Sequence, residues 1–554
     1  MAIEYALKSN EAGKKWLGIE NIKNPDKNDL SYISGSYFRI YNAYKSLANN
    51  KFRNKNIKEA LDNYIVAHDY LTACNPDSEY WQEEISWSLN SIGICYTSLK
   101  DYEKADSVFL LAINNYEKLN NPSEELLLYL LRNTAISLFE QREYDYSTEL
   151  FKSANYILLK DPLNHDNKEM LISNYNYISV NSISQDKLSD AMINVEEALL
   201  LGNKEEKSYC LSTLYYGLIY CKLDQYYKAD SILKESLDCY KAISESNNQD
   251  IAECYLALSR INISLAKYKN AEKYLNLGIE ITKNNYGTKS SRYANYLKTL
   301  AQLNKITGNY NSAEKQCYEV IDIYTKELGA NNNKLPEILL ELAELETILS
   351  KPNLAKMHSD NSLFIMNEYD TVLTPTYSIF FNNVAYIDYY TRFYNSADSL
   401  YRKVIEINYN FGLYNNTTIA NALNGMGLLE TKKRNYIKAD SLFNESLKIL
   451  KKIFIDSHPS IANIYLNKGV LFTLQGKLTE AEVFIKQAFE INNHFFEKDH
   501  DIFADIYVAL GDIKKIGHHN ETAKDYYRQA LEIYKKHFDD KHLKIISVKN
   551  KIQN

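Results

Sequence analysis

Small residues recur at a fixed spacing along this chain, and that period restricts the fold more than any other feature. Alanine stands at every 42nd position from Ala229 to Ala523, and steps of 38 to 45 residues extend the series back to Ala60. A fixed period of roughly 20–50 residues is typical of a solenoid, in which one supersecondary unit is stacked many times. The spacing therefore predicts about twelve repeats.

A second series lies twelve residues before the first, and we call its members the crossing residues. Every one is Gly, Ala or Ser: Ala48, Gly93, Ala135, Ser179, Gly217, Ser259, Ala301, Ala343, Ala385, Gly427, Gly469 and Gly511. Between the two series, Leu, Ile, Tyr and Phe recur at i, i+3, i+4 and i+7, the helical period. Small side chains let two helices cross closely. Each repeat is therefore predicted to be a pair of amphipathic helices, as in 461–495, where Gly476-Lys477 separates them.

The pattern resembles the tetratricopeptide repeat (TPR), and the 42-residue length resembles the longer variety of kinesin light chains and many bacterial proteins. Phe381-Asn382-Asn383-Val384-Ala385 is similar to that family's L-N-N-L-A, and His458-Pro459-Ser460-Ile461-Ala462 is similar to its H-P-x-x-A. The resemblance covers about residues 31–541. It implies an all-α fold, a right-handed α-solenoid superhelix of about twelve TPR helix pairs.

The regularity of the spacing predicts four parts. Residues 1–30 form an N-terminal segment, partly helical, with an isolated apolar cluster around Trp16. Residues 31–208 hold the irregular repeats one to four, and 209–541 hold the regular repeats five to twelve. Residues 542–554 resemble a first helix without its partner, so they are predicted to be a capping helix, as repeat arrays require.

Composition excludes several classes of partner. The net charge is −7 and no Lys/Arg run of the nucleic-acid-binding type occurs, which argues against nucleic-acid binding. The sequence contains no stretch of 18 apolar residues, which is the length that a membrane-spanning helix needs. The first 30 residues show no signal peptide. The seven cysteines are odd in number and form no CxxC pair, which favours buried free thiols in a reducing compartment. We predict a cytoplasmic protein, unless a targeting segment has been removed.

Nothing in the sequence supports catalysis. HExxH, GxSxG and GxGxxG are absent, and the glycines from Gly469 to Gly476-Lys477 have the wrong spacing for a phosphate loop. His458, His500 and His542 form a ladder with one member per repeat. Neighbouring helices lie roughly 10 Å apart, too far for these nitrogens to converge on one metal ion. They are predicted to pack at the start of each helix. We predict no enzyme activity, no cofactor and no metal.

The first helix of each TPR pair lines a concave groove, so its outward residues define the predicted binding site. Asparagine recurs there, and its carboxamide can pair with the backbone of an extended peptide, as the kinesin-light-chain resemblance implies. Tyr386 and Tyr389 (with Tyr390 beside them) are predicted anchors, and three cations form a basic patch for acidic groups. The predicted peptide-binding residues are Asn90, Asn133, Asn176, Arg260, Lys298, Lys305, Asn382, Asn383, Tyr386, Tyr389, Asn424 and Asn467.

Several alternatives stay open. Asparagine is abundant in this chain and could simply solvate helix faces. Lys45 and Asn49 resemble half of the carboxylate clamp of chaperone-binding TPR domains, but Ser91 and Tyr129 depart from it, so we do not predict chaperone-tail binding. The main prediction is a non-catalytic scaffold or adaptor for a protein or peptide. One alternative is a sensory subunit that restrains a separate effector, such as a CHAT caspase-like protease, a signalling ATPase or a transcription regulator. Another is self-assembly through the end repeats.

Overall fold

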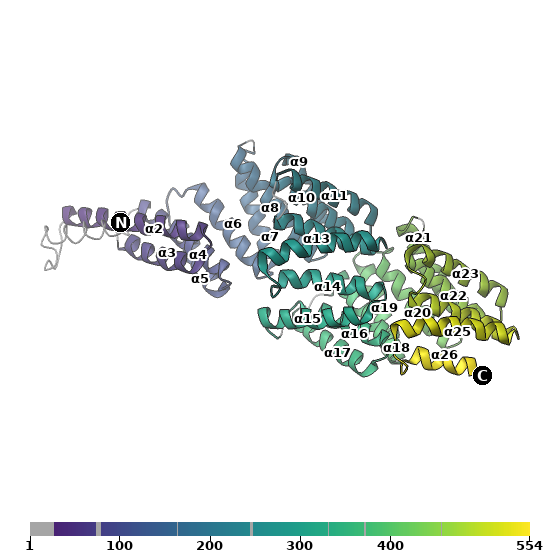
Figure 1. Ribbon diagram of the computed structural model, residues 1–554. Helices are drawn as coiled ribbons and strands as arrows, with labels where there is room; N and C mark the ends of the chain where they lie inside the picture. The colour runs from purple at the N-terminus through teal and green to yellow at the C-terminus, as the bar shows by residue number, and fades with distance from the viewer. Residues whose placement is uncertain are drawn as a thin grey trace. The chain divides into compact units, whose positions relative to one another are not determined.

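The computed structural model describes residues 27–73, 79–162, 164–243, 248–330, 332–369, 373–455 and 457–553. Every regular element in these residues is a helix, and short turns join one helix to the next (Figure 1). The chain divides into two compact bodies, an N-terminal body of Met1–Asn203 and a C-terminal body of Lys204–Asn554. Trp16 and most of the predicted N-terminal segment lie outside the described residues.

The helices follow one another in pairs. In the N-terminal body they are α2 (Lys27–Arg53), α3 (Ile57–Thr72), α4 (Glu79–Ser98), α5 (Tyr102–Tyr116), α6 (Glu124–Glu140), α7 (Tyr144–Leu158), α8 (His165–Ser184) and α9 (Leu188–Leu201). In the first half of the C-terminal body they are α10 (Lys207–Lys222), α11 (Tyr226–Ile243), α12 (Gln249–Ser264), α13 (Tyr268–Tyr286), α14 (Ser291–Ile306), α15 (Tyr310–Leu328), α16 (Leu335–Ile348) and α17 (Pro352–Tyr369).

The second half of the C-terminal body continues the series with α18 (Pro375–Tyr390), α19 (Tyr394–Asn410), α20 (Thr417–Lys432), α21 (Tyr436–Ile453), α22 (Pro459–Leu474), α23 (Leu478–Phe495), α24 (Asp501–Ile516), α25 (Asn520–His537) and the unpaired α26 (Leu543–Gln553). The described residues thus hold twelve helix pairs, each formed by an even-numbered helix and the next one. The predicted all-α solenoid is confirmed.

The crossing residues are small because a large side chain of the partner helix occupies the space beside them. A Cβ atom added to Gly427 would lie 2.5 Å from the ring of Phe443, and one added to Gly511 would lie 2.4 Å from the ring of Tyr527. The partner stands sixteen residues after the glycine in both cases, and the same spacing joins Gly93 to Phe109, Gly217 to Leu233 and Gly469 to Ile485. This contact recurs once per repeat, and it explains why a small residue recurs every 42 positions.

Each pair turns through one left-handed residue, seven positions after the crossing residue. The φ angles lie between 55° and 81° at Lys55, Lys100, Arg142, Asp186, Asp224, Ala266, Gly308, Ser350, Arg392, Arg434, Gly476 and His518. The amide of the next residue closes the turn, as when Gln225 donates to the carbonyl of Tyr220 at 3.0 Å. The second helix begins directly afterwards. The break predicted at Gly476-Lys477 is therefore one instance of a turn that all twelve pairs share.

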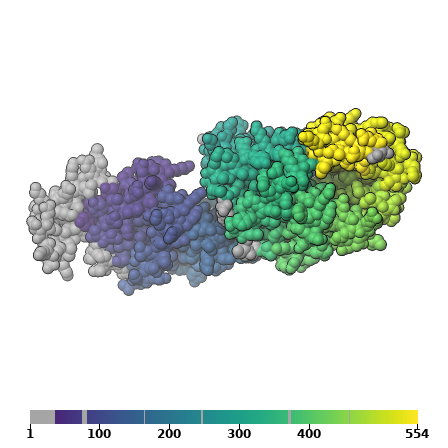
Figure 2. All heavy atoms as spheres, turned by 90° about the horizontal axis from the view of Figure 1, so that it is seen from below, coloured from purple at the N-terminus to yellow at the C-terminus, as the bar shows by residue number. Residues whose placement is uncertain are grey.

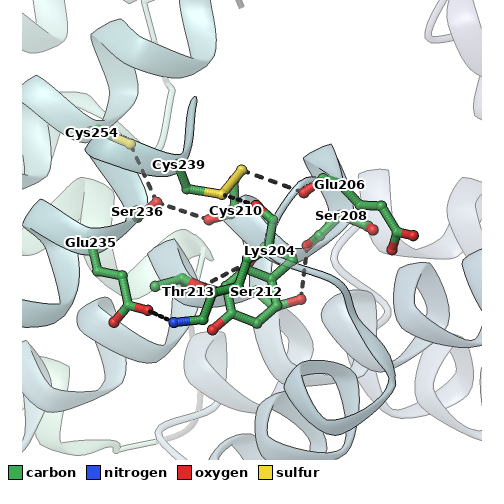
Figure 3. The surroundings of a disulfide bond; sticks show 11 residues. Lys204, Glu206, Ser208, Cys210, Ser212, Thr213, Glu235, Ser236, Cys239 and Cys254 are labelled. Atoms are coloured by element: carbon green, nitrogen blue, oxygen red, sulfur yellow. Dashed lines mark hydrogen bonds and ion pairs between the residues drawn. A yellow bond between two sulfur atoms is a disulfide. The ribbon is translucent and has the colours of Figure 1, made fainter. Parts of the chain in front are cut away.

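Two of the cysteines form a disulfide, so the prediction that all are free thiols is wrong for this pair. Cys210 on α10 and Cys239 on α11 are bonded, with their Cα atoms 5.6 Å apart (Figure 3). Ser236 lies beside them and donates to the carbonyl of Cys210. The disulfide could not be predicted from sequence spacing, because the two cysteines are 29 residues apart and meet only when the two helices pack. Among the described cysteines, Cys95, Cys221, Cys254 and Cys317 are free. The cytoplasmic location stays a prediction.

We expect the Cys239→Ser variant to be destabilised, because the disulfide closes a loop of about 29 residues in the unfolded chain. The loss should be about 2–4 kcal/mol. Urea denaturation of the oxidised parent and the variant measures it, and the parent with added reductant should match the variant. The Cys221→Ser variant, which changes a free thiol on α10, the helix that carries Cys210, is the control. Equal denaturation midpoints for oxidised and reduced parent would contradict the expectation.

The C-terminal body curls until its last helices lie on its first. The starts of α22, α24 and α26 contact the ends of α12, α14 and α16, which precede them by 194 residues in each case. Figure 2 shows the yellow C-terminal helices directly against the teal surface of this body. One hydrophobic cluster also joins residues of α14–α17 with residues of α24–α26. The C-terminal body therefore completes more than one superhelical turn, and its turns are in contact.

None of the described helices combines the length and the apolar character that a membrane span needs.

Candidate functional site

The first helices of neighbouring pairs form the inner surface of each body. First helices contact one another directly, as α16 contacts α18 and α18 contacts α20, whereas neighbouring second helices are more widely separated. Helices on the inside of a curved array are the more closely spaced ones. On α22, Asn463, Val470 and Leu474 are exposed, and Asn467 between them is half-buried. These stand six and two residues before the crossing residue and one and five after it. We call these four positions of every first helix the concave stripe.

The predicted asparagines divide into two groups by their register on the helix. Asn133, Asn383 and Asn467 stand two before the crossing residue and lie on the concave stripe. The others stand three before it, about 100° further round the helix. That rotation turns them toward the neighbouring first helix, and Asn90, Asn176 and Asn382 are buried there, while Asn424 is half-buried.

Two pairs of these asparagines bridge neighbouring repeats. The amide of Asn133 donates to Oδ1 of Asn90 at 3.0 Å, and the amide of Asn467 donates to Oδ1 of Asn424 at 2.8 Å. Each bridge joins a residue on the concave stripe to a more deeply placed one in the previous repeat. A carboxamide has two donor hydrogens and an acceptor oxygen, so the outer residue keeps capacity for a ligand. The asparagine row is thus partly structural: it connects first helices and presents Asn133 and Asn467 to the groove.

The three tyrosines of α18 form one aromatic cluster. The ring of Tyr390 lies 4.7 Å from that of Tyr386 and 5.1 Å from that of Tyr389. Tyr386 and Tyr390 belong to the concave stripe, and Tyr390 is 52% exposed. Burial raises the pKa of Tyr389, and the neighbouring phenols add to the effect. Burial also raises the pKa of Tyr390, while the positive charge of Lys544 opposes the rise. The cluster therefore faces the helices of the following superhelical turn.

The basic patch differs from the prediction, because two of its three cations are already neutralised. Lys305 lies 2.7 Å from Glu341 and 2.6 Å from Glu344, and all three side chains are at least 85% buried. Lys298 lies 2.5 Å from Glu337. Sequence reasoning missed these pairs because the carboxylates stand about one repeat later on α16.

Arg260 is the exception. Its guanidinium is exposed on the concave stripe of α12 and contacts Thr299 at 3.4 Å. Arg260 is thus the member of the patch that remains available to an acidic group of a ligand.

An apolar hollow between α22 and α24 was not predicted from the sequence. Val470, Leu474 and Ile516 line it together with Ala509, Asp512 and Lys515, around a cavity of about 150 Å³. Val470, Leu474 and Ile516 are exposed on the concave stripe. A signal was present for Leu474 and Ile516, which follow the crossing residue by five positions, where most repeats carry a polar residue or an aromatic one. Asn467 stands one helical turn before Val470 on the same stripe.

The fold and the concave stripe together define a class: an α-solenoid of helix pairs whose first helices form an inner surface in each body. Within this class, family models for the tetratricopeptide repeat match residues 209–284, 418–494 and 460–536, and a second one matches 294–333. All four matches lie in the C-terminal body. The chain is a tetratricopeptide-repeat protein. The comparison with curated protein sequences gives no match.

The chain is also similar to several solved structures. The crystal structure of the APC/C hetero-tetramer Cut9–Hcn1 is similar over 100% of this chain and 95% of that one, with 11% identity and a TM-score of 0.53. A Rap protein complexed with Competence and Sporulation Factor aligns with 67% of this chain and 99% of its own, at 13% identity and a TM-score of 0.49. A putative kinesin light chain with TPR-like repeats from Podosopora anserina covers 37% of this chain and 98% of its own, at 15% identity and a TM-score of 0.29.

Proposed function

We propose that this protein is a non-catalytic scaffold that binds an extended segment of another protein on its concave surface. The observation that carries the proposal is the juxtaposition on α22 and α24 of an apolar hollow and an amide row. Val470, Leu474 and Ile516 offer an apolar socket, and Asn467 stands beside it with hydrogen-bonding capacity to spare. An apolar socket with a few polar groups is the usual composition of a ligand site.

In this proposal, the asparagines and the apolar socket of the stripe recognise different parts of the ligand. Asn467 and Asn383 would pair with main-chain groups of the ligand, which are the same in every sequence. The apolar socket would take one side chain and select for its size. Tyr386, Tyr389 and Tyr390 would extend the contact surface on α18, and Arg260 would take an acidic group. Asn90, Asn176, Asn382, Asn424, Lys298 and Lys305 would act through the groups that they hold in place, since they are buried or already paired.

The regulatory alternative uses the same surface. A sensory subunit would bind a segment of its effector (a CHAT caspase-like protease, a signalling ATPase or a transcription regulator) and restrain it. The identity and activity of a bound partner separate the two functions: a scaffold leaves the activity of its partner unchanged, whereas a restraining subunit lowers it.

Selection from a library of unstructured peptides displayed on phage tests the binding proposal directly. We expect selected peptides to share one apolar residue. Leu474→Glu or Ile516→Glu should weaken their binding at least about tenfold, because each removes apolar contact area. Asn467→Ala should weaken it about two- to tenfold through the loss of one hydrogen bond. Fluorescence polarisation with a labelled peptide measures each dissociation constant.

Ile437→Glu is the matched control, because Ile437 is an apolar residue on a second helix and is 90% exposed. It should bind as the parent does. Circular dichroism must show the same helicity for all variants. Peptides whose binding survives Leu474→Glu and Ile516→Glu but is lost in Ile437→Glu would place the site on the convex surface and contradict the proposal.

A further inference from the structure

The two turns of the C-terminal body meet along a repeated seam of aromatic rings. At three successive repeats, the first tyrosine of a second helix stacks on a phenylalanine 228 residues later, and that phenylalanine stacks on a histidine four residues further on. The three columns are Tyr226–Phe454–His458, Tyr268–Phe496–His500 and Tyr310–Phe538–His542. The Phe-to-His centroid distances are 3.6, 4.2 and 3.9 Å. The His ladder therefore has a structural role between the turns as well as at the helix starts.

Each histidine uses both ring nitrogens in the seam. In His458, Nδ1 accepts a hydrogen bond from the amide of Ser460 at 3.1 Å and so caps α22. Its Nε2 lies 3.0 Å from the carbonyl oxygen of Ser264, the last residue of α12. His500 and His542 repeat both contacts, and their Nε2 atoms lie 2.9 Å from the carbonyl of Ile306 and 2.7 Å from that of Ile348.

The amide and carbonyl contacts of these histidines together require one protonation state. Nδ1 must carry no hydrogen in order to accept a hydrogen bond from an amide, and Nε2 must carry one in order to donate to a carbonyl. That is the neutral tautomer with the proton on Nε2. A second proton on Nδ1 would set two donors against each other at the helix start. Protonation therefore removes the cap and opposes closure of the seam.

The charged and titratable groups that face each histidine differ. Burial lowers the pKa of His458 to about 4, and the hydrogen bond to the Ser264 carbonyl is the opposing influence. His500 faces Asp501, whose carboxylate lies 3.3 Å away, as well as Asp505 and His537. His542 faces Lys544, Asp539 and Asp501. Burial lowers the pKa of both despite these carboxylates.

His537 also contacts the seam from α25. Its two ring nitrogens lie 3.1 Å from the carbonyl oxygen of Gly308 and 2.7 Å from that of Asp499. Both of these neighbours are carbonyl oxygens, whereas each of the three capping histidines contacts one amide and one carbonyl.

We propose that His458, His500 and His542 make the closure of the C-terminal body sensitive to protons: neutral, they hold one superhelical turn against the other, and charged, they release it. Release separates α22, α24 and α26 from α12, α14 and α16 while each helix pair keeps its own core. It also widens the interior beside Tyr390, which faces Lys544 and Asp505 of the second turn.

The direction and size of the effect follow from proton linkage. An open seam exposes the histidines to water, where the pKa is near 6.5, so the open form binds more protons than the closed form below that pH. Closure is therefore fully favoured above pH 6.5 and weakens between pH 6.5 and about 4. At pH 5.0, His458 alone should raise the ratio of open to closed molecules about 20-fold over its value at neutral pH.

Small-angle X-ray scattering and hydrogen exchange of the full chain at pH 7.5 and pH 5.0 test the proposal. We expect a larger radius of gyration at pH 5.0 and faster exchange of the amides of Ser460, Ile502 and Lys544, with unchanged helicity by circular dichroism. The informative variant changes all three histidines to Asn. Asparagine already caps α20 at the equivalent position, Asn416, and has no proton to gain. This variant should show the same radius at both pH values, whether its seam is closed or open.

The control is His165→Asn, at an exposed helix start of the N-terminal body, which should respond to pH as the parent does. Three results would overturn the proposal. The first is a parent whose radius and exchange do not change between the two pH values. The second is a triple variant that still expands at pH 5.0. The third is a loss of helicity that accompanies the expansion, because it would mean that the repeats unfold and do not separate.

Discussion

Phe443→Ala should destabilise the protein by about 3–5 kcal/mol, the usual cost of removing a buried phenylalanine. Phe443 on α21 is fully buried, and its ring fills the space beside Gly427 on α20. Because Phe443 and Gly427 belong to one helix pair, the loss should appear first as early unfolding of α20 and α21. Urea denaturation followed by circular dichroism measures the total change, and hydrogen exchange locates it.

Phe364→Ala is the matched control, since Phe364 also lies on a second helix, α17, but is 61% exposed. It should change stability by no more than about 0.5 kcal/mol. Gly427→Ala adds a further test. In the parent, its Cβ would lie 2.5 Å from the Phe443 ring and should destabilise the pair by about 1–3 kcal/mol. In the Phe443→Ala background the same change should be nearly neutral. Additive losses would show that the two side chains do not compete for one space.

Lys305→Met should be destabilising by about 3–5 kcal/mol near neutral pH, because it leaves Glu341 and Glu344 together without their cation. The three side chains are 13%, 14% and 15% exposed, so water can do little to compensate. Burial already raises the pKa of Glu344 in the parent, where Lys305 opposes the rise. Loss of Lys305 should raise it further. Urea denaturation at pH 8 measures the effect.

The pH dependence of this variant has a definite sign. A carboxyl group whose pKa is raised in the folded state binds protons there first, so folding is favoured as the pH falls toward its unfolded pKa near 4.5. The loss of stability in Lys305→Met should therefore be smaller at pH 5.5 than at pH 8. A further Glu344→Gln change should reduce this loss at both pH values.

Lys298→Met is the matched control for the ion pair. Its partner Glu337 is 74% exposed, so the loss should stay below about 1 kcal/mol. Equal losses of stability for Lys298→Met and Lys305→Met would show that burial of the Lys305 cluster does not increase the cost of removing its cation.

Much of the fold could be predicted from the sequence, and less of the surface. Gly427 and its counterparts identify where helices cross, because that constraint acts within one repeat. The concave stripe required a finer distinction. Asn382 and Asn383 are neighbours in sequence, yet about 100° of helical rotation buries the first and leaves the second on the stripe. A one-residue shift is beyond what the period of apolar residues resolves.

The sequence by itself determined the local architecture: twelve helix pairs, their spacing and the small residues at their crossings. Its 42-residue period reflects contacts between residues that are close in the chain. Only the tertiary structure decided which distant groups meet. Lys305 pairs with Glu344, which stands about one repeat later in the chain. His458 contacts the carbonyl of Ser264, which precedes it by 194 residues. The second contact depends on superhelical pitch, which is the sum of small rotations between successive repeats. No single repeat specifies that sum, so the seam and its three histidines emerge only when the whole C-terminal body is assembled.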